Sequence, residues 1–506
     1  MIYSTMASFW HKGKLVLASA ALLAATTAFS AAPIVPGSPP ATPSPTTPVP
    51  MPPPTPLPGP NTVSPYLSQL PFASPDITPP QIAPKVFTIT QYGAEANNLS
   101  PMAIAANTTA INTAIADASK SGGGEVVIPA GLWVTGSIVM QSNVNLHTDN
   151  GAVVEFTANH DAYPLITQFG QKTYQAPIYA VGLSNIAITG SGIFNGSGNT
   201  WNPVKEFQLT NRQWQTLLQS GGVVNNQTWY PSAQIEQDQN LIPFMVLVLN
   251  SKNILINGPT FENSPSEAMY INFSSNVIVS HTKVLNTWYS VNTVGVDVAS
   301  DHDFLMYDDT INTGDDGIVL NASPGSQPDT VNNIVIQDST IYNAHGGFAV
   351  GSYTDGGVKD VYVNNVNMIG TEDGIRFKSA VGRGGLVQDV YLNNIHMQNI
   401  QDYAITFNSD YNNQSPATGS LTTLTNVPQF QNIYFNNFVC DYAGEAIRIN
   451  GLPYAPVSDV FFNNVSIKAA QQYLIDNTSN VSTSTVSYTY AQELGLVPHY
   501  GVDGPA

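Results

Sequence analysis

Two adjacent carboxylates, Asp315 and Asp316, are the residues of this chain that most directly fit a chemical role. Like charges side by side raise each other's pKa, so one carboxyl keeps its proton while its neighbour is ionised. A general acid and a general base for the hydrolysis of an acetal need that combination. The surrounding Gly-Asp-Asp-Gly equally fits a plain turn, because Gly and Asp tolerate the dihedral angles that turns require.

Further polar residues follow the pair at regular intervals. His345 begins His-Gly-Gly, Arg376 and Lys378 flank Phe377, and Tyr411 follows later. Residues i and i+2 of a strand project from one face, so Arg376 and Lys378 together would favour a ligand that carries a carboxylate. Each of these residues alone also fits a loop or a solvated strand face. The set is informative because one motif falls on each of several successive repeats.

The repeats predict how these residues are positioned. Each begins with Asn or Asp, continues with alternating apolar residues, and in most copies ends with Asn or Gly. The copies start at residues 185, 253, 276, 333, 360, 389, 432 and 459. Such a unit buries its apolar side only against its neighbours, which predicts a solenoid. Short strands with asparagine at the corners predict an all-β fold, a parallel β-helix, because asparagine tolerates left-handed backbone and its side chains can form ladders between coils. A β-propeller is the alternative.

Two segments of the folded part depart from the repeat. Residues 102–120 have apolar side chains near helical spacing and end at a glycine run, which predicts an N-terminal helix that caps the solenoid. Residues 201–230 form an aromatic-rich insertion, and insertions in solenoids often wall a binding groove. We place the parallel β-helix domain at residues 85–506 and assign no function to the stretch from Tyr473 onward.

The start of the chain predicts export. Residues 1–32 have a basic stretch, an apolar stretch and small-residue cleavage sites, as in a signal peptide, with an uncleaved membrane anchor as the alternative. Residues 33–84 form a proline-rich linker. The single cysteine, Cys440, permits no intrachain disulfide. We therefore expect a secreted or periplasmic monomer without stable membrane association after signal removal. The formal charge of -19 argues against nucleic acid as a partner.

The motif set resembles glycoside hydrolase family 28, the polygalacturonases and their relatives, and is closest to the bacterial exo-acting members. The resemblance covers roughly residues 87–464 and includes Gly-Asp-Asp, His-Gly-Gly and Arg-Phe-Lys, the last in place of the family's Arg-Ile-Lys. It implies a right-handed, single-stranded parallel β-helix of the pectin-lyase-like type. It also implies hydrolysis of α-1,4-galacturonosyl bonds in pectin with inversion, an acidic polysaccharide as partner, and neither a metal nor an organic cofactor.

The resemblance also assigns roles. Asp315 matches the general acid, Asp316 a carboxylate that helps to activate water, and His345 the residue that holds the protonation state of the acid. The implied substrate-binding residues are Asn292, Gly346, Arg376, Lys378 and Tyr411, with Arg383 as a further candidate cation.

One departure from the family pattern affects the expected chemistry. Val294 stands where the family has an aspartate that shares the role of base, and Asp297, three positions on, is expected to face away from the site. Loss of a general base costs roughly 10²–10⁴-fold in rate. Three readings stay open: Asp316 acts as sole base, the specificity is shifted towards rhamnogalacturonan or another decorated pectin, or the protein binds acidic polysaccharide with little turnover.

Two other classes of protein fit the repeat less well. A calcium-dependent pectate lyase would need a carboxylate cluster for the ion, and a structural adhesin would not explain the ordered Asp, His, Arg and Lys positions. The sequence leaves endo and exo action equally open.

Overall fold

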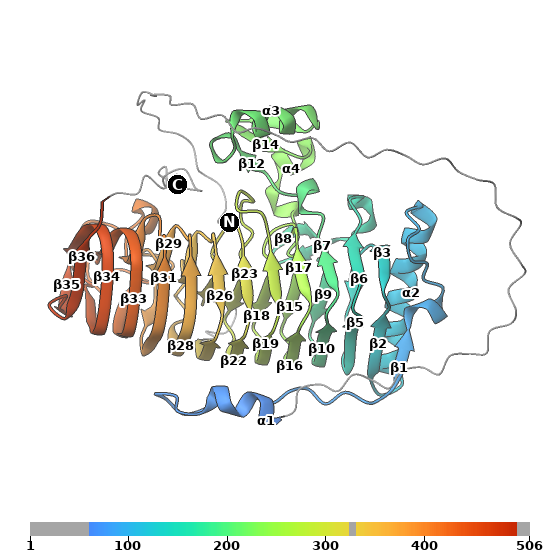
Figure 1. Cartoon of the computed structure of the whole chain (residues 1–506), viewed down its shortest axis with the longest axis horizontal. Coiled ribbons are helices and arrows are strands. Elements are labelled where there is room, and N and C mark those ends of the chain that lie inside the picture. Colours follow the sequence, from blue (N-terminus) through green and yellow to red (C-terminus); the bar gives the residue numbers. More distant parts are fainter. Residues whose placement is uncertain (1–59, 323–329, 493–506) are drawn as a thin grey trace, which may run out of the picture. The chain divides into compact units, whose positions relative to one another are not determined.

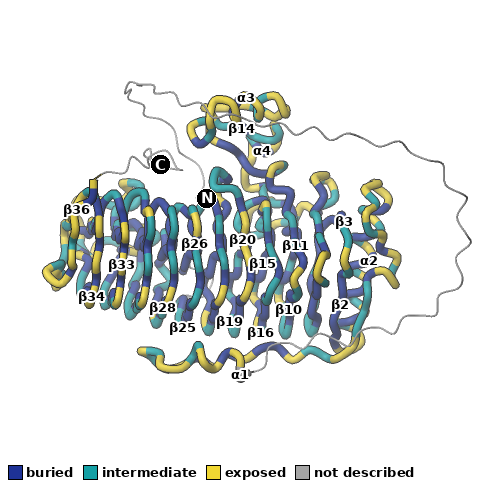
Figure 2. The backbone as a smooth tube through the Cα atoms, viewed as in Figure 1, coloured by how far each residue is buried: buried dark blue, intermediate teal, exposed yellow. Residues whose placement is uncertain are grey.

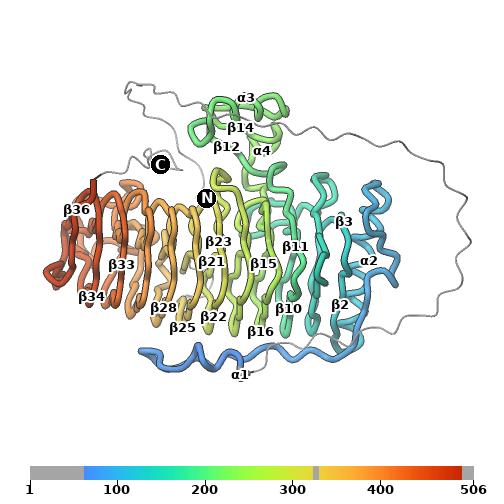
Figure 3. The backbone as a smooth tube through the Cα atoms, in the orientation of Figure 1, coloured from blue at the N-terminus to red at the C-terminus, as the bar shows by residue number. Residues whose placement is uncertain are grey.

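The structure is a computed structural model that describes residues 60–322 and 330–492. The predicted signal peptide and most of the proline-rich linker, residues 33–59, lie outside the described residues. None of the described helices combines the length and the apolar composition of a membrane span. The described chain is a parallel β-helix, as the repeats predicted, and its coils follow one another in sequence order (Figures 1 and 3).

Each coil contributes strands to three columns, within which strands of successive coils pair in parallel. Column 1 contains β4 (Ile138–Val139), β9 (Ile178–Val181), β15 (Val246–Leu249), β18 (Met269–Asn272), β21 (Val296–Ala299), β24 (Ile318–Asn321), β27 (Gly346–Val350), β29 (Asp373–Lys378) and β32 (Tyr403–Asn408). Column 2 contains β1 (Val86–Thr88), β2 (Gly124–Ile128), β5 (Val144–Thr148), β10 (Ser184–Gly190), β16 (Lys252–Asn257), β19 (Ser275–Ser280), β22 (His302–Tyr307) and β25 (Val331–Gln337).

Column 3 contains β3 (Gly131–Thr135), β6 (Ala152–Phe156), β11 (Ile193–Asn195), β17 (Thr260–Glu262), β20 (Lys283–Leu285), β23 (Thr310–Asn312) and β26 (Thr340–Tyr342). In the later coils longer strands run on from column 2 into column 3, and β33 and β34 continue into column 1. They are β28 (Val358–Ile369), β31 (Val390–Gln398), β33 (Gln429–Asn450) and β34 (Val457–Asp476), with the short strands β30 (Leu386–Val387), β35 (Thr478–Val481) and β36 (Val486–Tyr490) beside them.

The eight repeat segments found in the sequence all lie in column 2. The Asn or Asp that begins each of them has a left-handed backbone, with φ between 51° and 58°. Asparagine amides also join across coils: Asn253 Nδ2 donates to Asn185 Oδ1 at 2.9 Å, and Asn276 Nδ2 donates to Asn253 Oδ1 at 2.9 Å. The expected role of asparagine at the corners is confirmed.

The interior of the coils is filled by one continuous apolar cluster. Figure 2 shows the buried residues along the coils. At its N-terminal end lies α2 (Pro101–Lys120), the expected capping helix, whose buried face includes Ile111 and Ile115. Ser100 caps this helix by accepting a hydrogen bond from the Ala103 amide at 3.2 Å. The cap covers apolar strand ends that would otherwise meet water.

Residues 62–84, which we assigned to the linker, pack along the outside of column 2. This segment includes the end of α1 (Pro60–Val63) and the 3₁₀ turn η1 (Ser64–Leu67). Val63 and Ile77 are buried against side chains such as Leu255, and the ring of Tyr66 stacks on Tyr307 with centroids 4.0 Å apart. The domain boundary at residue 85 remains a prediction.

The insertion projects beside column 1 as a separate small unit (Figure 1). Its elements are β12 (Val204–Lys205), η5 (Glu206–Gln208), α3 (Asn211–Gln219), β13 (Val223–Asn225), β14 (Thr228–Tyr230), α4 (Ala233–Gln237) and η6 (Gln239–Leu241). Val204, Trp214 and Trp229 form its own core, and Tyr289 of the β-helix packs against them. An antiparallel hairpin, β7 (Leu165–Gln168) and β8 (Gln171–Tyr174), lies earlier in the chain.

Candidate active site

Asp315 and Asp316 lie in the turn between β23 and β24, at the edge of column 1. The Asp316 amide donates to Asp315 Oδ1 at 2.7 Å, which orients the Asp315 carboxyl group against the backbone of its neighbour. Burial raises the pKa of Asp315, and the neighbouring Asp316 carboxylate raises it further, while Lys378 opposes the shift. Asp315 therefore keeps its proton to a higher pH than an ordinary aspartate.

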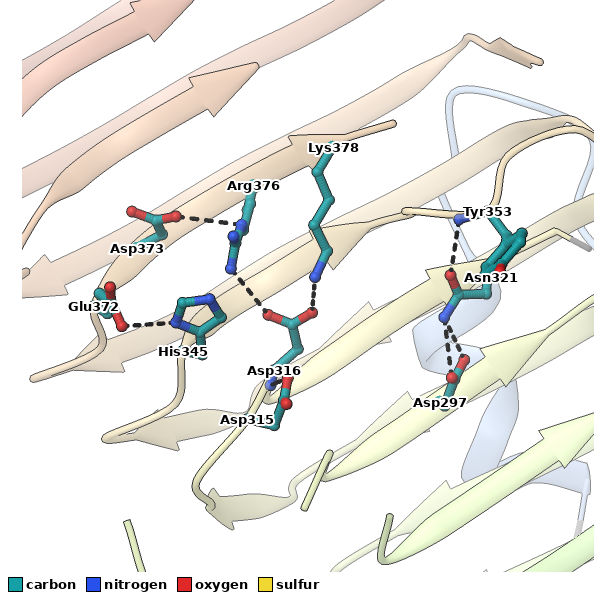
Figure 4. A network of polar contacts seen from close by, with 10 residues as sticks. All are labelled: Asp297, Asp315, Asp316, Asn321, His345, Tyr353, Glu372, Asp373, Arg376 and Lys378. Carbon is teal, nitrogen blue, oxygen red and sulfur yellow. Dashed lines mark hydrogen bonds and ion pairs between the residues drawn. The ribbon is translucent and has the colours of Figure 1, made fainter. Parts of the chain in front are cut away.

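Two cations on β29 face Asp316 (Figure 4). Lys378 Nζ donates to Asp316 Oδ2 at 2.7 Å, and Arg376 Nη1 lies 3.9 Å from Asp316 Oδ1. All three side chains are buried, with Asp316 only 2% exposed. Burial lowers the pKa of Lys378, but Asp316, Tyr411 and Asp315 together more than offset this, so the net pKa is raised and the ammonium stays charged.

His345 is held on the other side of the pair by an acid that the sequence analysis missed. Its Nδ1 lies 2.6 Å from Glu372 Oε2, and its backbone amide donates to the Asp315 carbonyl at 3.0 Å (Figure 4). Burial and the cations Arg376 and Lys378 lower the pKa of His345 well below its usual value. A neutral ring that donates from Nδ1 to the carboxylate leaves Nε2 as a hydrogen-bond acceptor.

Tyr411, in the 3₁₀ turn η7 (Tyr411–Asn413), lies beside the cations. Its ring centroid is 5.4 Å from the Arg376 guanidinium carbon and 5.5 Å from Lys378 Nζ. The Arg383 guanidinium carbon is also 5.4 Å from this ring centroid, so the structure brings this further candidate cation into the same group. An aromatic face among three cations is a surface on which a sugar that carries a carboxylate could stack.

The two remaining predicted residues, Gly346 and Asn292, differ in how far they are buried. Gly346 begins β27, directly opposite Asp316, and a Cβ at this position would lie 2.6 Å from Asp316 Oδ1. Asn292 is exposed, in a turn with φ +57°, two residues before Val294. Asn292 therefore lies on the rim, while Gly346 lies in the floor of the site.

The expectation that Asp297 faces away from the site is wrong. Asp297 on β21 is in register with Val319, Ala349 and Arg376 on the next three strands of column 1, so its side chain lies on the same face as Arg376. Strand alternation does not hold from Val294 to Asp297, because β21 begins only at Val296 and the chain bends at Gly295. Asn321 Nδ2 donates to both oxygens of Asp297, at 3.1 and 3.0 Å.

Buried carboxyl groups thus gather along this face. Burial raises the pKa of Asp297 to about 7, and the Asp316 and Asp315 charges add to the shift. Glu267, which no motif marked, belongs to the same group: burial and the charges of Asp297, Asp315 and Asp316 raise its pKa well above the usual value. Val294, Val319 and Ala349 form a small apolar cluster, of which Val319 and Ala349 lie in the register row from Asp297 to Arg376.

Lys205 of the insertion reaches the same neighbourhood. Its positive charge contributes to the lowered pKa of His345, which places β12 within electrostatic range of the candidate site. Among the residues that the structure describes, no three His, Cys, Asp or Glu side chains are arranged to hold a metal ion.

The fold and the site together define a β-helix enzyme class with paired carboxyl groups beside a cationic, aromatic surface. The sequence profile of the glycosyl hydrolases of family 28 matches residues 119–487. The chain therefore belongs to glycosyl hydrolase family 28 and is a glycosidase.

Individual relatives agree with this assignment. A probable polygalacturonase of Vitis vinifera is 25% identical over 388 residues, which span 72% of this chain and 71% of the relative. An exo-poly-α-D-galacturonosidase of Dickeya chrysanthemi is 24% identical over 460 residues, which span 83% and 75%. The crystal structure of an exopolygalacturonase from Thermotoga maritima superposes with a TM-score of 0.66, covers 81% of this chain and 93% of its own, and shares 23% identity.

Proposed function

We propose that this protein hydrolyses α-1,4-galacturonosyl bonds of polygalacturonate in pectin, with inversion at the anomeric carbon. The observation that carries the proposal is the placement of Asp315 and Asp316 beside Arg376 and Lys378 on one face of column 1. Both curated relatives described above are named for action on polygalacturonate.

In the proposed reaction, Asp315 donates its proton to the glycosidic oxygen as the bond to the anomeric carbon breaks. The raised pKa of Asp315 keeps this proton available. Water attacks the opposite face of the sugar, and a carboxylate accepts the proton that it loses. Asp316 helps to activate this water, and neutral His345 holds the protonation state of Asp315.

Arg376 and Lys378 bind the carboxylate of the galacturonate, and Tyr411 stacks on its ring. Asp316 occupies only some of the hydrogen-bond donors of Arg376 and Lys378, because a guanidinium has five donors and an ammonium three. Gly346 leaves room beside Asp316, and Asn292 contacts the sugar from the rim. The chain needs no metal or organic cofactor for this chemistry in the proposal.

The proposal extends to the whole chain. Residues 1–32 act as a signal peptide, residues 33–84 as a linker whose last part, residues 62–84, packs on column 2, and residues 85–506 as the hydrolase domain. The mature protein is a secreted or periplasmic monomer that binds acidic polysaccharide, without nucleic acid or stable membrane association.

The test is release of reducing ends from polygalacturonate between pH 3 and 7, by the full chain without its signal peptide and by Asp315→Asn. We expect the variant to lose about 10²–10⁴-fold in kcat. Asp308→Asn, an exposed aspartate on the turn after β22, is the matched control and should retain wild-type activity.

Nuclear magnetic resonance of the first product gives the anomer, and a β-configured reducing end is expected for inversion. If polygalacturonate is bound but not cleaved, the protein is a binder that has lost turnover through Val294. Cleavage of rhamnogalacturonan in place of polygalacturonate would assign the shifted specificity.

A further inference from the structure

Glu267 lies one coil before Val294, the position at which the family has an aspartate. The inference drawn from it rests on the proposed function. The register of β18 with β21 pairs Met269 with Val296, and two residues back along both strands it sets Glu267 beside Val294. The backbone supports this continuation, because the Ala268 amide donates to the Val294 carbonyl at 2.8 Å.

The same row continues into the site. The register of β21 with β24 pairs Val296 with Ile318, which sets Val294 beside Asp316 two residues back. The Gly295 amide donates to the Asp316 carbonyl at 2.9 Å, in agreement with this register. Glu267, Val294 and Asp316 therefore occupy one row on three successive coils, with the valine in the middle.

One oxygen of the Glu267 carboxyl group is left without a donor among the described residues. Its Oε2 is buried and accepts no hydrogen bond from any residue that the structure describes, and the same holds for Asp316 Oδ1. Asp316 Oδ2 is bound to Lys378, and Asp297 accepts two hydrogen bonds from Asn321. A buried carboxyl oxygen without a donor costs free energy, so its retention needs a reason other than stability.

The spacing suits an inverting hydrolase. Strands are about 4.8 Å apart, so the α-carbons of Glu267 and Asp316 are separated by roughly 10 Å. Inverting glycosidases hold the general acid and the general base about 6.5–9.5 Å apart, which leaves room for the water. The acid of this proposal, Asp315, is the residue before Asp316 in the chain. Glu267 extends one methylene further than an aspartate, so its carboxyl group can lean over the short side chain of Val294.

We propose that Glu267 is the general base of this enzyme and takes the place of the aspartate that Val294 replaces. The oxygen of water bonds to the anomeric carbon, the glycosidic C–O bond breaks, and the proton of the water passes to Glu267. Asp315 gives its proton to the leaving oxygen, and exchange with solvent restores both groups. Asp316 orients the water and holds Lys378.

The surroundings of Glu267 set the acid limb of the pH profile. Burial raises the pKa of Glu267 well above that of an ordinary glutamate. The titratable groups Asp297, Asp315 and Asp316, which face it, raise the pKa further when they are ionised. A base works only when it is deprotonated. Activity should therefore fall on the acid side at a pH higher than an ordinary glutamate would give.

The first test compares Glu267→Gln with the wild type and with Glu262→Gln, a partly buried glutamate of the same coil bonded to Asn195. In Glu267→Gln we expect kcat on polygalacturonate to fall about 10²–10⁴-fold. The Kd for trigalacturonate should stay within about threefold, and the acid limb of the kcat profile should disappear. Glu262→Gln should match the wild type in all three measurements.

The second test is rescue by the reciprocal change. Val294→Asp in the Glu267→Gln background restores a carboxylate one strand away and should recover at least tenfold in kcat. Glu267→Asp, which keeps the charge but shortens the reach, should lose activity while the acid limb persists, and it serves as the test if Glu267→Gln does not fold.

Wild-type kcat in Glu267→Gln would overturn this inference and leave the proposed function intact. An inactive wild-type protein that becomes active through Val294→Asp alone would also overturn it. If neither the wild type nor Val294→Asp cleaves polygalacturonate or rhamnogalacturonan, the proposed function fails and the inference fails with it.

Discussion

At the scale of single residues, the Asp316 carboxylate is positioned by two cations on one strand and by the lack of a side chain opposite it. Lys378 binds one of its oxygens at 2.7 Å and Arg376 lies 3.9 Å from the other. Gly346 faces the same carboxylate across the strand pair, where any Cβ would approach it to 2.6 Å. Gly346 thus acts by leaving space for the charge.

Gly346→Ala should therefore disable the site without unfolding the protein. The added methyl group forces Asp316 away from Lys378, because a contact of 2.6 Å is too short for a Cβ. We expect kcat on polygalacturonate to fall at least tenfold, while the urea midpoint of unfolding stays close to that of the wild type.

A double variant separates displacement of Asp316 from other effects of the methyl group. In the Asp316→Asn background, which is already impaired, Gly346→Ala should cost little further activity, because residues in contact are not additive. An equal loss in both backgrounds would contradict the role given to Gly346.

Two residues show where reasoning from the sequence reaches its limit. The Asp, His, Arg and Lys motifs could be found because each has a recognisable pattern and the coils bring them together. Glu267 has no pattern of its own, and only the register between β18 and β21 places it beside Val294. Asp297 was misplaced because strand alternation does not extend through the turn before β21.

At the scale of elements, the Asn and Asp residues at the corners of column 2 mark the repeat of the fold. A repeat that starts with Asn or Asp could be read from the sequence because only few residue types accept a left-handed backbone without large cost. The insertion could be located by the interruption of the repeat, but its helices and its core around Trp214 follow from contacts that no periodicity encodes. The packing of Val63 and Ile77 on column 2 could likewise not be predicted from the sequence, because the surrounding segment is irregular.

Asn253 tests the corner ladder, since it donates to Asn185 and accepts from Asn276, both at 2.9 Å, with φ +58°. Asn253→Ala loses both hydrogen bonds, at about 1 kcal/mol each, and strains the left-handed backbone by roughly 1–2 kcal/mol. We expect a loss of about 3–4 kcal/mol in the free energy of unfolding, measured by urea titration.

Asn253→Gly is the matched comparison, because glycine accepts the left-handed backbone but cannot form the ladder. It should be less destabilising than Asn253→Ala. Equal losses in the two variants would mean that the backbone conformation contributes nothing and that the amide ladder alone stabilises the corner.

At the scale of the whole molecule, the charge of the protein opposes the charge of the proposed substrate. The chain carries a formal net charge of -19, and polygalacturonate is a polyanion. Attraction comes from a few buried cations, with Arg376 4% and Lys378 8% exposed. Buried pairs are screened by salt much less than exposed charges are. Added salt should therefore weaken the long-range repulsion more than the local binding of a carboxylate.

The value of kcat/KM for polygalacturonate should rise with ionic strength. Between 0.01 M and 0.1 M salt the Debye length falls from about 30 Å to about 10 Å, which removes most of the repulsion during approach. We expect an increase of about 3- to 10-fold with little change in kcat, because electrostatic fields act mainly on association. Digalacturonate, with two charges only, should show a much smaller increase. A steady fall of kcat/KM with salt for both substrates would contradict this prediction. It would mean that the cations at the site, and not the net charge, determine the electrostatic field that the substrate meets during its approach.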